Sequence, residues 1–258
     1  MNLLIVIFGF CLLAVIFLRR YLIMEEKMDF LPFSRKRKRL GSLLHLHWHG
    51  HDTKEITAEE IIPDATTVDP KLVTKAEIYY RKAEIMLGRG DLKNAEKTLI
   101  QAISVNPGYV EAYSKLGLIY LRQNQFNKAE NIFRKLILTI ADNATFLSNL
   151  GLALYSQKKL EEARDYYKKA VALDDSRAGR FFSLGQIHYE LGEIEDAINH
   201  IRKAVTMEPR NIDYLLTLAE FYIDHNKPEE ANEVINEVLS LSPGNETALK
   251  MQENLKKD

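Results

Sequence analysis

The 258-residue sequence predicts an all-α solenoid of five stacked helical hairpins, on three observations. An alanine returns every 34 residues, as Ala95, Ala129, Ala163, Ala197 and Ala231. A small residue precedes each of these alanines by twelve positions, as Ala83, Gly117, Gly151, Gly185 and Ala219. Residues expected at turns recur at the same period, as Gly90, Asn124, Lys158, Gly192 and Asn226. A period of this size is typical of stacked repeats, and paired small residues allow two helices to approach closely.

The first element expected along the chain is a transmembrane anchor over residues 1–24. Residues 3–18 are apolar apart from Gly9, and Arg19 and Arg20 follow them. The run is close to the roughly 20 residues that span a bilayer, and arginine side chains that reach the interface can make up the difference. No basic segment precedes the run and no small-residue cleavage site follows it. An uncleaved anchor is therefore expected rather than a secretory signal.

A basic juxtamembrane segment is expected over residues 25–44. The candidates for contact with the membrane surface are Arg19, Arg20, Arg35, Lys36, Arg37, Lys38 and Arg39. Each cation near the headgroups contributes about 1 kcal/mol; the alternative is that these charges serve only to retain the anchor. Because positive charge marks the cytoplasmic side of a membrane protein, we expect a single-pass chain with its N-terminus outside and the remainder in the cytoplasm.

Residues 45–69 are expected to form a histidine-containing and then acidic linker. His45, His47, His49 and His51 alternate and would share one face of an extended strand. Neutral imidazoles bind zinc, copper or nickel, but a stable metal site needs rigid support from neighbouring groups. A loosely ordered linker is the preferred interpretation, with metal binding and pH sensing as alternatives. The linker carries six acidic residues against one basic residue.

The repeat array is expected to occupy residues 70–258. Asp69 before Pro70 is typical of a helix start, so the first helix is predicted over about Pro70–Gly88. The array divides into repeats at 76–109, 110–143, 144–177, 178–211 and 212–245, followed by a capping helix at 246–258.

This unit resembles the tetratricopeptide repeat, a helix-turn-helix motif of the same length. Repeat two matches with Tyr113, Leu116, Gly117, Tyr120, Ala129 and Phe133. Repeat four matches with Phe181, Leu184, Gly185, Gly192, Ala197, Ile201, Ala204 and Pro209. The resemblance implies a right-handed superhelix that binds other proteins, as in membrane-anchored bacterial members of the family.

The resemblance also implies a concave groove lined by the first helices of successive repeats. Carried over to this sequence, the binding residues are Tyr80, Leu118, Leu121, Asn149, Leu152, Tyr155, Phe182 and Tyr189. Asn149 stands where some members use asparagine to hold a peptide backbone. Tyr80, Glu84 and Gln186 stand where chaperone-binding members carry the cations that hold a carboxylate. We therefore expect an apolar or aromatic ligand with basic flanks.

Composition and motifs argue against catalysis, cofactors and nucleic acid. The 26 basic and 27 acidic residues after Asp69 leave no basic stripe for nucleic acid. No Gly-rich phosphate loop occurs, and His188, His200 and His225 are dispersed among the repeats, with His188 interpreted as a packing residue. The single Cys11 excludes a disulfide within one chain. We expect no enzyme and no cofactor, and no metal except in the alternative for the histidine segment.

Three functions stay open after these exclusions. The leading one is a membrane-tethered adaptor or scaffold of the bacterial inner membrane, which binds protein partners through the groove at the cytoplasmic face. The alternatives are a homo-oligomeric structural scaffold and an import receptor of an organelle outer membrane.

Overall fold

The computed structural model describes residues 70–256, which form eleven helices. These are α2 (Pro70–Gly88), α3 (Leu92–Val105), α4 (Val110–Arg122), α5 (Phe126–Thr139), α6 (Ala144–Ser156), α7 (Leu160–Leu173), α8 (Ala178–Glu190), α9 (Ile194–Met207), α10 (Ile212–Asp224), α11 (Pro228–Leu241) and α12 (Glu246–Leu255). The expected anchor, basic segment and linker lie outside the described residues. None of the helices within 70–256 is both long enough and apolar enough to cross a membrane.

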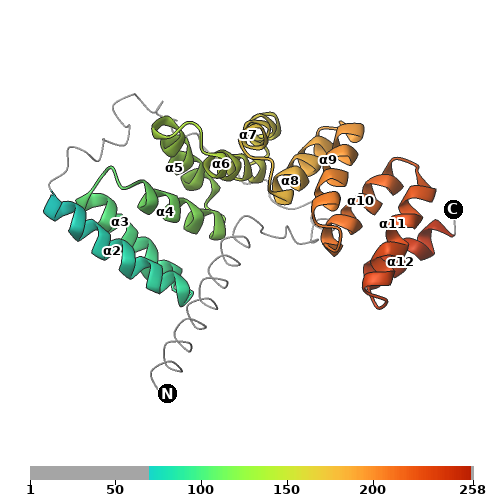
Figure 1. Cartoon of the computed structure of the whole chain (residues 1–258), viewed down its shortest axis with the longest axis horizontal. Helices are drawn as coiled ribbons and strands as arrows, with labels where there is room; N and C mark the ends of the chain where they lie inside the picture. The colour runs from blue at the N-terminus through green and yellow to red at the C-terminus, as the bar shows by residue number, and fades with distance from the viewer. Residues whose placement is uncertain (1–69, 257–258) are drawn as a thin grey trace, which may run out of the picture. The chain divides into compact units, whose positions relative to one another are not determined.

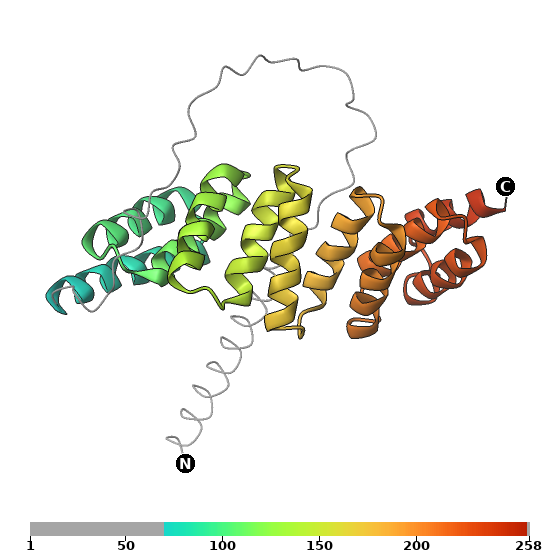
Figure 2. The same ribbon diagram turned by 90° about the horizontal axis from the view of Figure 1, so that it is seen from above.

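The helices pair into five hairpins in chain order, followed by α12 as a cap (Figure 1). Each hairpin packs its second helix against the first helix of the next hairpin. Figure 2 shows the same succession from above, with each hairpin beside its sequence neighbours. The predicted solenoid of five hairpins and a cap is confirmed, including the predicted bounds of α2.

The turn inside each hairpin has the left-handed backbone conformation that the sequence predicts. Positive φ angles occur at Gly90 (78°), Asn124 (58°), Lys158 (65°), Gly192 (77°) and Asn226 (55°). The residue after each one donates its N–H to the carbonyl five positions earlier in all five turns. This bond satisfies a carbonyl at the helix end, and glycine or asparagine lowers the conformational cost of the turn. Lys158 adopts the same conformation without either advantage.

The recurring small residues lie where the two helices of a hairpin cross. A Cβ atom on Gly117 would lie 2.8 Å from Phe133 Cζ, and one on Gly151 would lie 2.6 Å from Tyr167 Cδ2. On Gly185 it would lie 2.5 Å from Ile201 Cδ1. The five periodic alanines are fully buried. The small residue and the alanine twelve positions later therefore mark the contact between the two helices of each hairpin, as the sequence predicts.

Asparagine side chains cap the start of two later first helices, α6 and α10, and of the capping helix α12. Asn143 accepts the N–H groups of Thr145 and Phe146, both at 3.0 Å. Asn211 caps α10 and Asn245 caps α12 in the same way. An asparagine at this position satisfies N–H groups that have no partner within the helix, so these caps fix where these three helices start.

Candidate protein-binding groove

The expected groove residues belong to α2, α4, α6 and α8, and the structure divides them into two sets. Four of them are buried: Tyr80, Leu121, Asn149 and Phe182. The Tyr80 ring lies 5.2 Å from that of Tyr109, and the Phe182 ring stacks at 4.7 Å on Tyr214. The Phe182–Tyr214 pair therefore joins repeat four to repeat five, and Tyr80 packs against the residue that directly precedes α4.

The other four groove residues keep part of their surface open. They are Leu118, Leu152, Tyr155 and Tyr189, all partly buried. These residues lie on α4, α6 and α8, in the middle of the array. The apolar surface that a partner can contact is thus narrower than the sequence indicated.

The two partly exposed tyrosines share one arrangement, repeated 34 residues apart. Tyr155 donates a hydrogen bond of 2.6 Å to Glu190, and Tyr189 donates one to Asp224. Lys158 pairs with Glu190 and lies over the Tyr155 ring. Burial, followed by the hydrogen bond to Asp224, raises the pKa of Tyr189. The Tyr189 phenol therefore stays protonated at neutral pH, and each of the two phenols stands beside a carboxylate, which favours a ligand with basic groups near its aromatic contact.

Two buried polar atoms of α6 have no hydrogen-bond partner among the described residues. They are the side-chain nitrogen of Asn149, which is 3% exposed, and the hydroxyl oxygen of Ser156. Residues three or seven positions apart lie on the same face of a helix. Asn149 and Ser156 therefore lie on the same face of α6 as Leu152, one on either side of it. Most buried polar groups in proteins are hydrogen-bonded, and these two are the polar groups available beside the apolar part of the groove.

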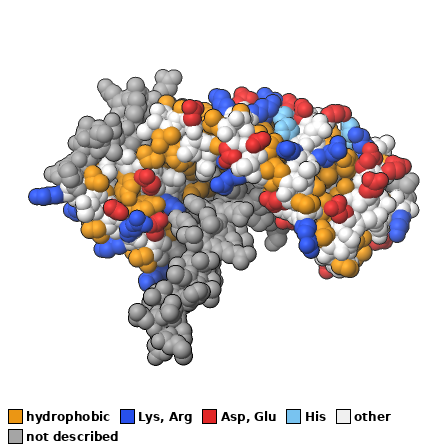
Figure 3. All heavy atoms as spheres, in the orientation of Figure 1, with side chains coloured by type: hydrophobic (Ala, Val, Ile, Leu, Met, Phe, Trp, Pro, Cys, Tyr) orange, Lys and Arg blue, Asp and Glu red, His pale blue; other side chains and the backbone are white. Residues whose placement is uncertain are grey.

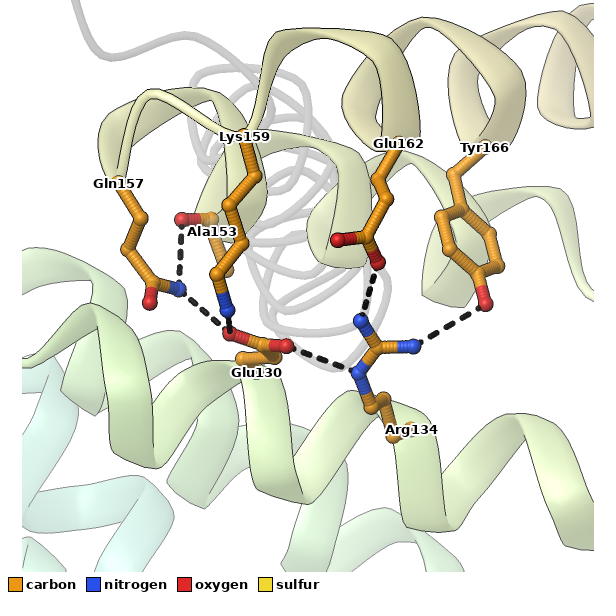
Figure 4. Close-up of polar contacts among 7 residues, drawn as sticks. All are labelled: Glu130, Arg134, Ala153, Gln157, Lys159, Glu162 and Tyr166. Carbon is orange, nitrogen blue, oxygen red and sulfur yellow. Dashed lines mark hydrogen bonds and ion pairs between the residues drawn. The ribbon is translucent and has the colours of Figure 1, made fainter. Parts of the chain in front are cut away.

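A polar network on the second helices joins repeats two and three (Figure 4). Glu130 on α5 accepts hydrogen bonds from Arg134 at 2.9 Å, Lys159 at 2.8 Å and Gln157 at 2.7 Å. Arg134 also reaches Glu162 at 2.6 Å. Burial raises the pKa of Glu130, but the three hydrogen bonds together outweigh it, so the pKa lies below its usual range.

The junction between repeats three and four has an ion pair at the positions that match Glu130 and Lys159, with the charges exchanged. Arg164, 34 residues after Glu130, donates a hydrogen bond of 2.9 Å to Glu193, 34 residues after Lys159. These ion pairs join the second helices of neighbouring repeats, so we interpret this surface as a set of repeat junctions rather than as a binding site.

The structure corrects the view that the histidines are dispersed. The rings of His188 and His200 stack at 4.9 Å. His188 is 2% exposed, as expected of a packing residue. Its Nδ1 contacts Glu193, and burial lowers its pKa despite this carboxylate, so the imidazole is neutral at pH 7.

His188, Glu193 and Asp196 are the described residues that could hold a metal ion, with possible ligand atoms within 4.8 Å of one another. A structural zinc site uses four ligands, whereas this group supplies three. The sequence candidates His45, His47, His49 and His51 lie outside the described residues, and the prediction for them stays a prediction.

The sequence profiles that match this chain all describe the same family. Four sequence profiles described as "Tetratricopeptide repeat" match residues 76–109, 98–131, 115–178 and 188–255. Together they cover residues 76–255 apart from a gap at 179–187 within α8. None of the profiles belongs to a family of enzymes. Curated proteins give no match to this chain.

Solved structures match the array at low sequence identity. One is YrrB, "a TPR protein with an unusual peptide-binding site", at 19% identity and TM-score 0.59, with 68% of this chain and 90% of that chain covered. A second is MamA from Desulfovibrio magneticus RS-1, at 20% identity and TM-score 0.63, with 67% and 97% covered. A third is Pseudomonas aeruginosa pilF, at 21% identity and TM-score 0.62, with 72% and 85% covered. At these identities the likeness concerns the fold alone.

Proposed function

Because the chain belongs to the tetratricopeptide repeat family, we propose that it is an adaptor that binds a protein segment on the groove side of α4, α6 and α8. Proteins with this fold typically mediate protein–protein interaction. The ligand we propose is a peptide segment with an apolar or aromatic residue and basic flanks. Its apolar part contacts Leu118, Leu152 and Tyr155, and its basic groups lie near Asp224.

The observation that carries this proposal is the unpartnered pair on α6. A peptide main chain offers carbonyl and N–H groups at short intervals, which suit the Asn149 amide and the Ser156 hydroxyl. An unsatisfied buried amide is unfavourable in the free protein, so a hydrogen bond formed on binding favours the complex. A change in the Asn149 side-chain rotamer would bring its amide to a ligand lying over Leu152.

Photocrosslinking in native membranes tests the groove. We place p-benzoylphenylalanine at position 152 of the full chain, and at position 202 on α9 as a control. Specific protein adducts are expected at position 152 only, and Asn149→Leu should remove them. No hydrogen bond to the Asn149 amide nitrogen is lost in this variant, so its stability should be unchanged or raised. Equal adducts at both positions, or adducts that survive Asn149→Leu, would contradict the proposal.

We further propose that the adaptor is tethered to the bacterial inner membrane, with the array in the cytoplasm. The support is the apolar run of residues 3–18 and the cluster of basic residues that follows it. Protease added to intact spheroplasts should leave the array uncleaved until the membrane is permeabilised. Cleavage in intact spheroplasts would reverse the orientation, and release of the chain by alkaline washing would exclude the anchor.

A further inference from the structure

The outer face of α2 differs from the matching face of every later first helix. In α4, α6, α8 and α10, the third and tenth residues of the repeat are buried; they are Ala112 and Ile119, Phe146 and Ala153, Arg180 and Ile187, and Tyr214 and Phe221. The matching residues of α2, Ile78 and Ile85, are 53% and 56% exposed. Two large aliphatic side chains, two helical turns apart, are thus open to solvent.

The later repeats show what this face contacts. Tyr214 and Phe221 on α10 stack on Phe182 and Tyr189 of the preceding α8. Arg180 on α8 donates hydrogen bonds of 2.6 Å to the backbone and to the carboxylate of Asp174, just after α7. Residues at these positions therefore face the preceding repeat. Because α2 begins the described array, no preceding hairpin within residues 70–256 covers Ile78 and Ile85.

The charge around this pair is positive. Lys75, Lys82 and Arg89 follow the same helical stripe and are exposed. Within the described residues none of the three forms an ion pair. Lys82 stands where every later repeat has a buried leucine, namely Leu116, Leu150, Leu184 and Leu218. Figure 3 shows hydrophobic side chains over α2 with Lys and Arg side chains along the same helix. Two copies of this face would repel each other, so it favours an acidic occupant.

The chain itself supplies a segment of the required chemistry. Residues 52–69 directly precede α2 and contain six acidic residues, one lysine, and the aliphatic residues Ile56, Ile61 and Ile62. Extended, eighteen residues reach up to about 60 Å, whereas the nineteen-residue α2 is about 28 Å long. The segment is therefore long enough to return along the whole helix. Its covalent attachment gives it a high effective concentration at α2.

We propose that the outer face of α2 is a docking surface and that its occupant is the acidic segment 52–69 of the same chain. The isoleucines of the segment cover Ile78 and Ile85, and its carboxylates lie near Lys75, Lys82 and Arg89. Docking covers the apolar outer face of the first helix of the array.

Disulfide formation in the full chain tests this contact. With Cys11→Ser as background, Ile61→Cys is combined with Ile78→Cys. The matched control pairs Ile61→Cys with Glu77→Cys, which is adjacent in sequence, similarly exposed at 53% and directed to another face of α2. Docking should make the intramolecular disulfide form about tenfold faster at position 78 than at position 77, because only position 78 lies against the segment.

Charge exchange tests the partner. Lys82→Glu should slow disulfide formation at position 78 by about threefold or more, and adding Glu60→Lys should restore part of the rate. Equal rates at positions 77 and 78 would mean that the linker meets α2 without preference, and would overturn the proposal. A product of twice the chain mass would identify a second copy as the occupant and would also overturn it. The proposal would also be overturned if neither charge change altered the rate of disulfide formation at position 78.

Discussion

Replacing Gly151 with alanine should test the helix crossing at the centre of the array. The added Cβ atom would lie 2.6 Å from Tyr167 Cδ2 and 2.8 Å from Cε2. Ordinary carbon–carbon contacts are about 3.5–4.0 Å, so the ring must retreat by about 1 Å. Tyr167 is 4% exposed and its ring is rigid, so neighbouring side chains must move with it.

Two effects of opposite sign set the magnitude. Alanine is favoured over glycine in a helix by about 1 kcal/mol, whereas overpacking a core costs about 1–3 kcal/mol. The control is Gly88→Ala, at the end of α2, where an added Cβ meets nothing within 4 Å. The control should be neutral or stabilised, and Gly151→Ala should be less stable than the control by about 1–3 kcal/mol.

Urea denaturation followed by circular dichroism measures both variants. For an array of this length, each kcal/mol of lost stability lowers Tm by about 2–4 °C. If both variants showed the same free energy of unfolding, Gly151 would not lie at a close helix crossing, and the register of the repeats would be wrong.

Three further predictions concern the junction, the caps and the turns. Glu130→Gln should lower the free energy of unfolding by about 1.5–3 kcal/mol in urea denaturation, because Arg134 and Lys159 lose a charged acceptor. The pKa of Glu130 is lowered in the folded protein, so the ionised carboxylate stabilises the fold above the usual carboxyl range, and this stabilisation is lost as the pH falls through the lowered pKa. Acidification should therefore destabilise the wild type more than it destabilises Glu130→Gln. Asn143→Ala removes the cap of α6 and should cost about 1 kcal/mol, whereas the exposed Asn131→Ala should cost little in the same thermal melts. Gly192→Ala forces a φ of 77° on a residue with a Cβ and should cost about 1–2 kcal/mol by chemical denaturation, with no steric contribution because nothing lies within 4 Å.

The groove residues show that the repeat register predicts which helix a residue lies on but not which residues its side chain packs against. The positions assigned to the groove from the family pattern do lie on the first helices, yet Phe182 stacks on Tyr214 of the next repeat and Tyr80 packs against Tyr109, which directly precedes α4. The Phe182 side chain is long enough to cross the junction, and a pattern of positions carries no information about which way a ring turns. The Tyr155–Glu190 and Tyr189–Asp224 pairs could have been found from the sequence, because both join residues 35 apart.

The sequence by itself determined the number of hairpins, their register and the positions of their turns. These features follow from local chemistry, because glycine and asparagine tolerate positive φ and a small residue must stand where two helices cross. The tertiary structure alone decided which polar groups find partners. Among residues 70–256, the amide nitrogen of Asn149 has no partner, whereas the carboxylate of Glu130 has three, although both are buried polar residues. It also showed that Ile78 and Ile85 are open to solvent, because exposure depends on whether a neighbouring hairpin covers the helix rather than on the residues of the helix itself.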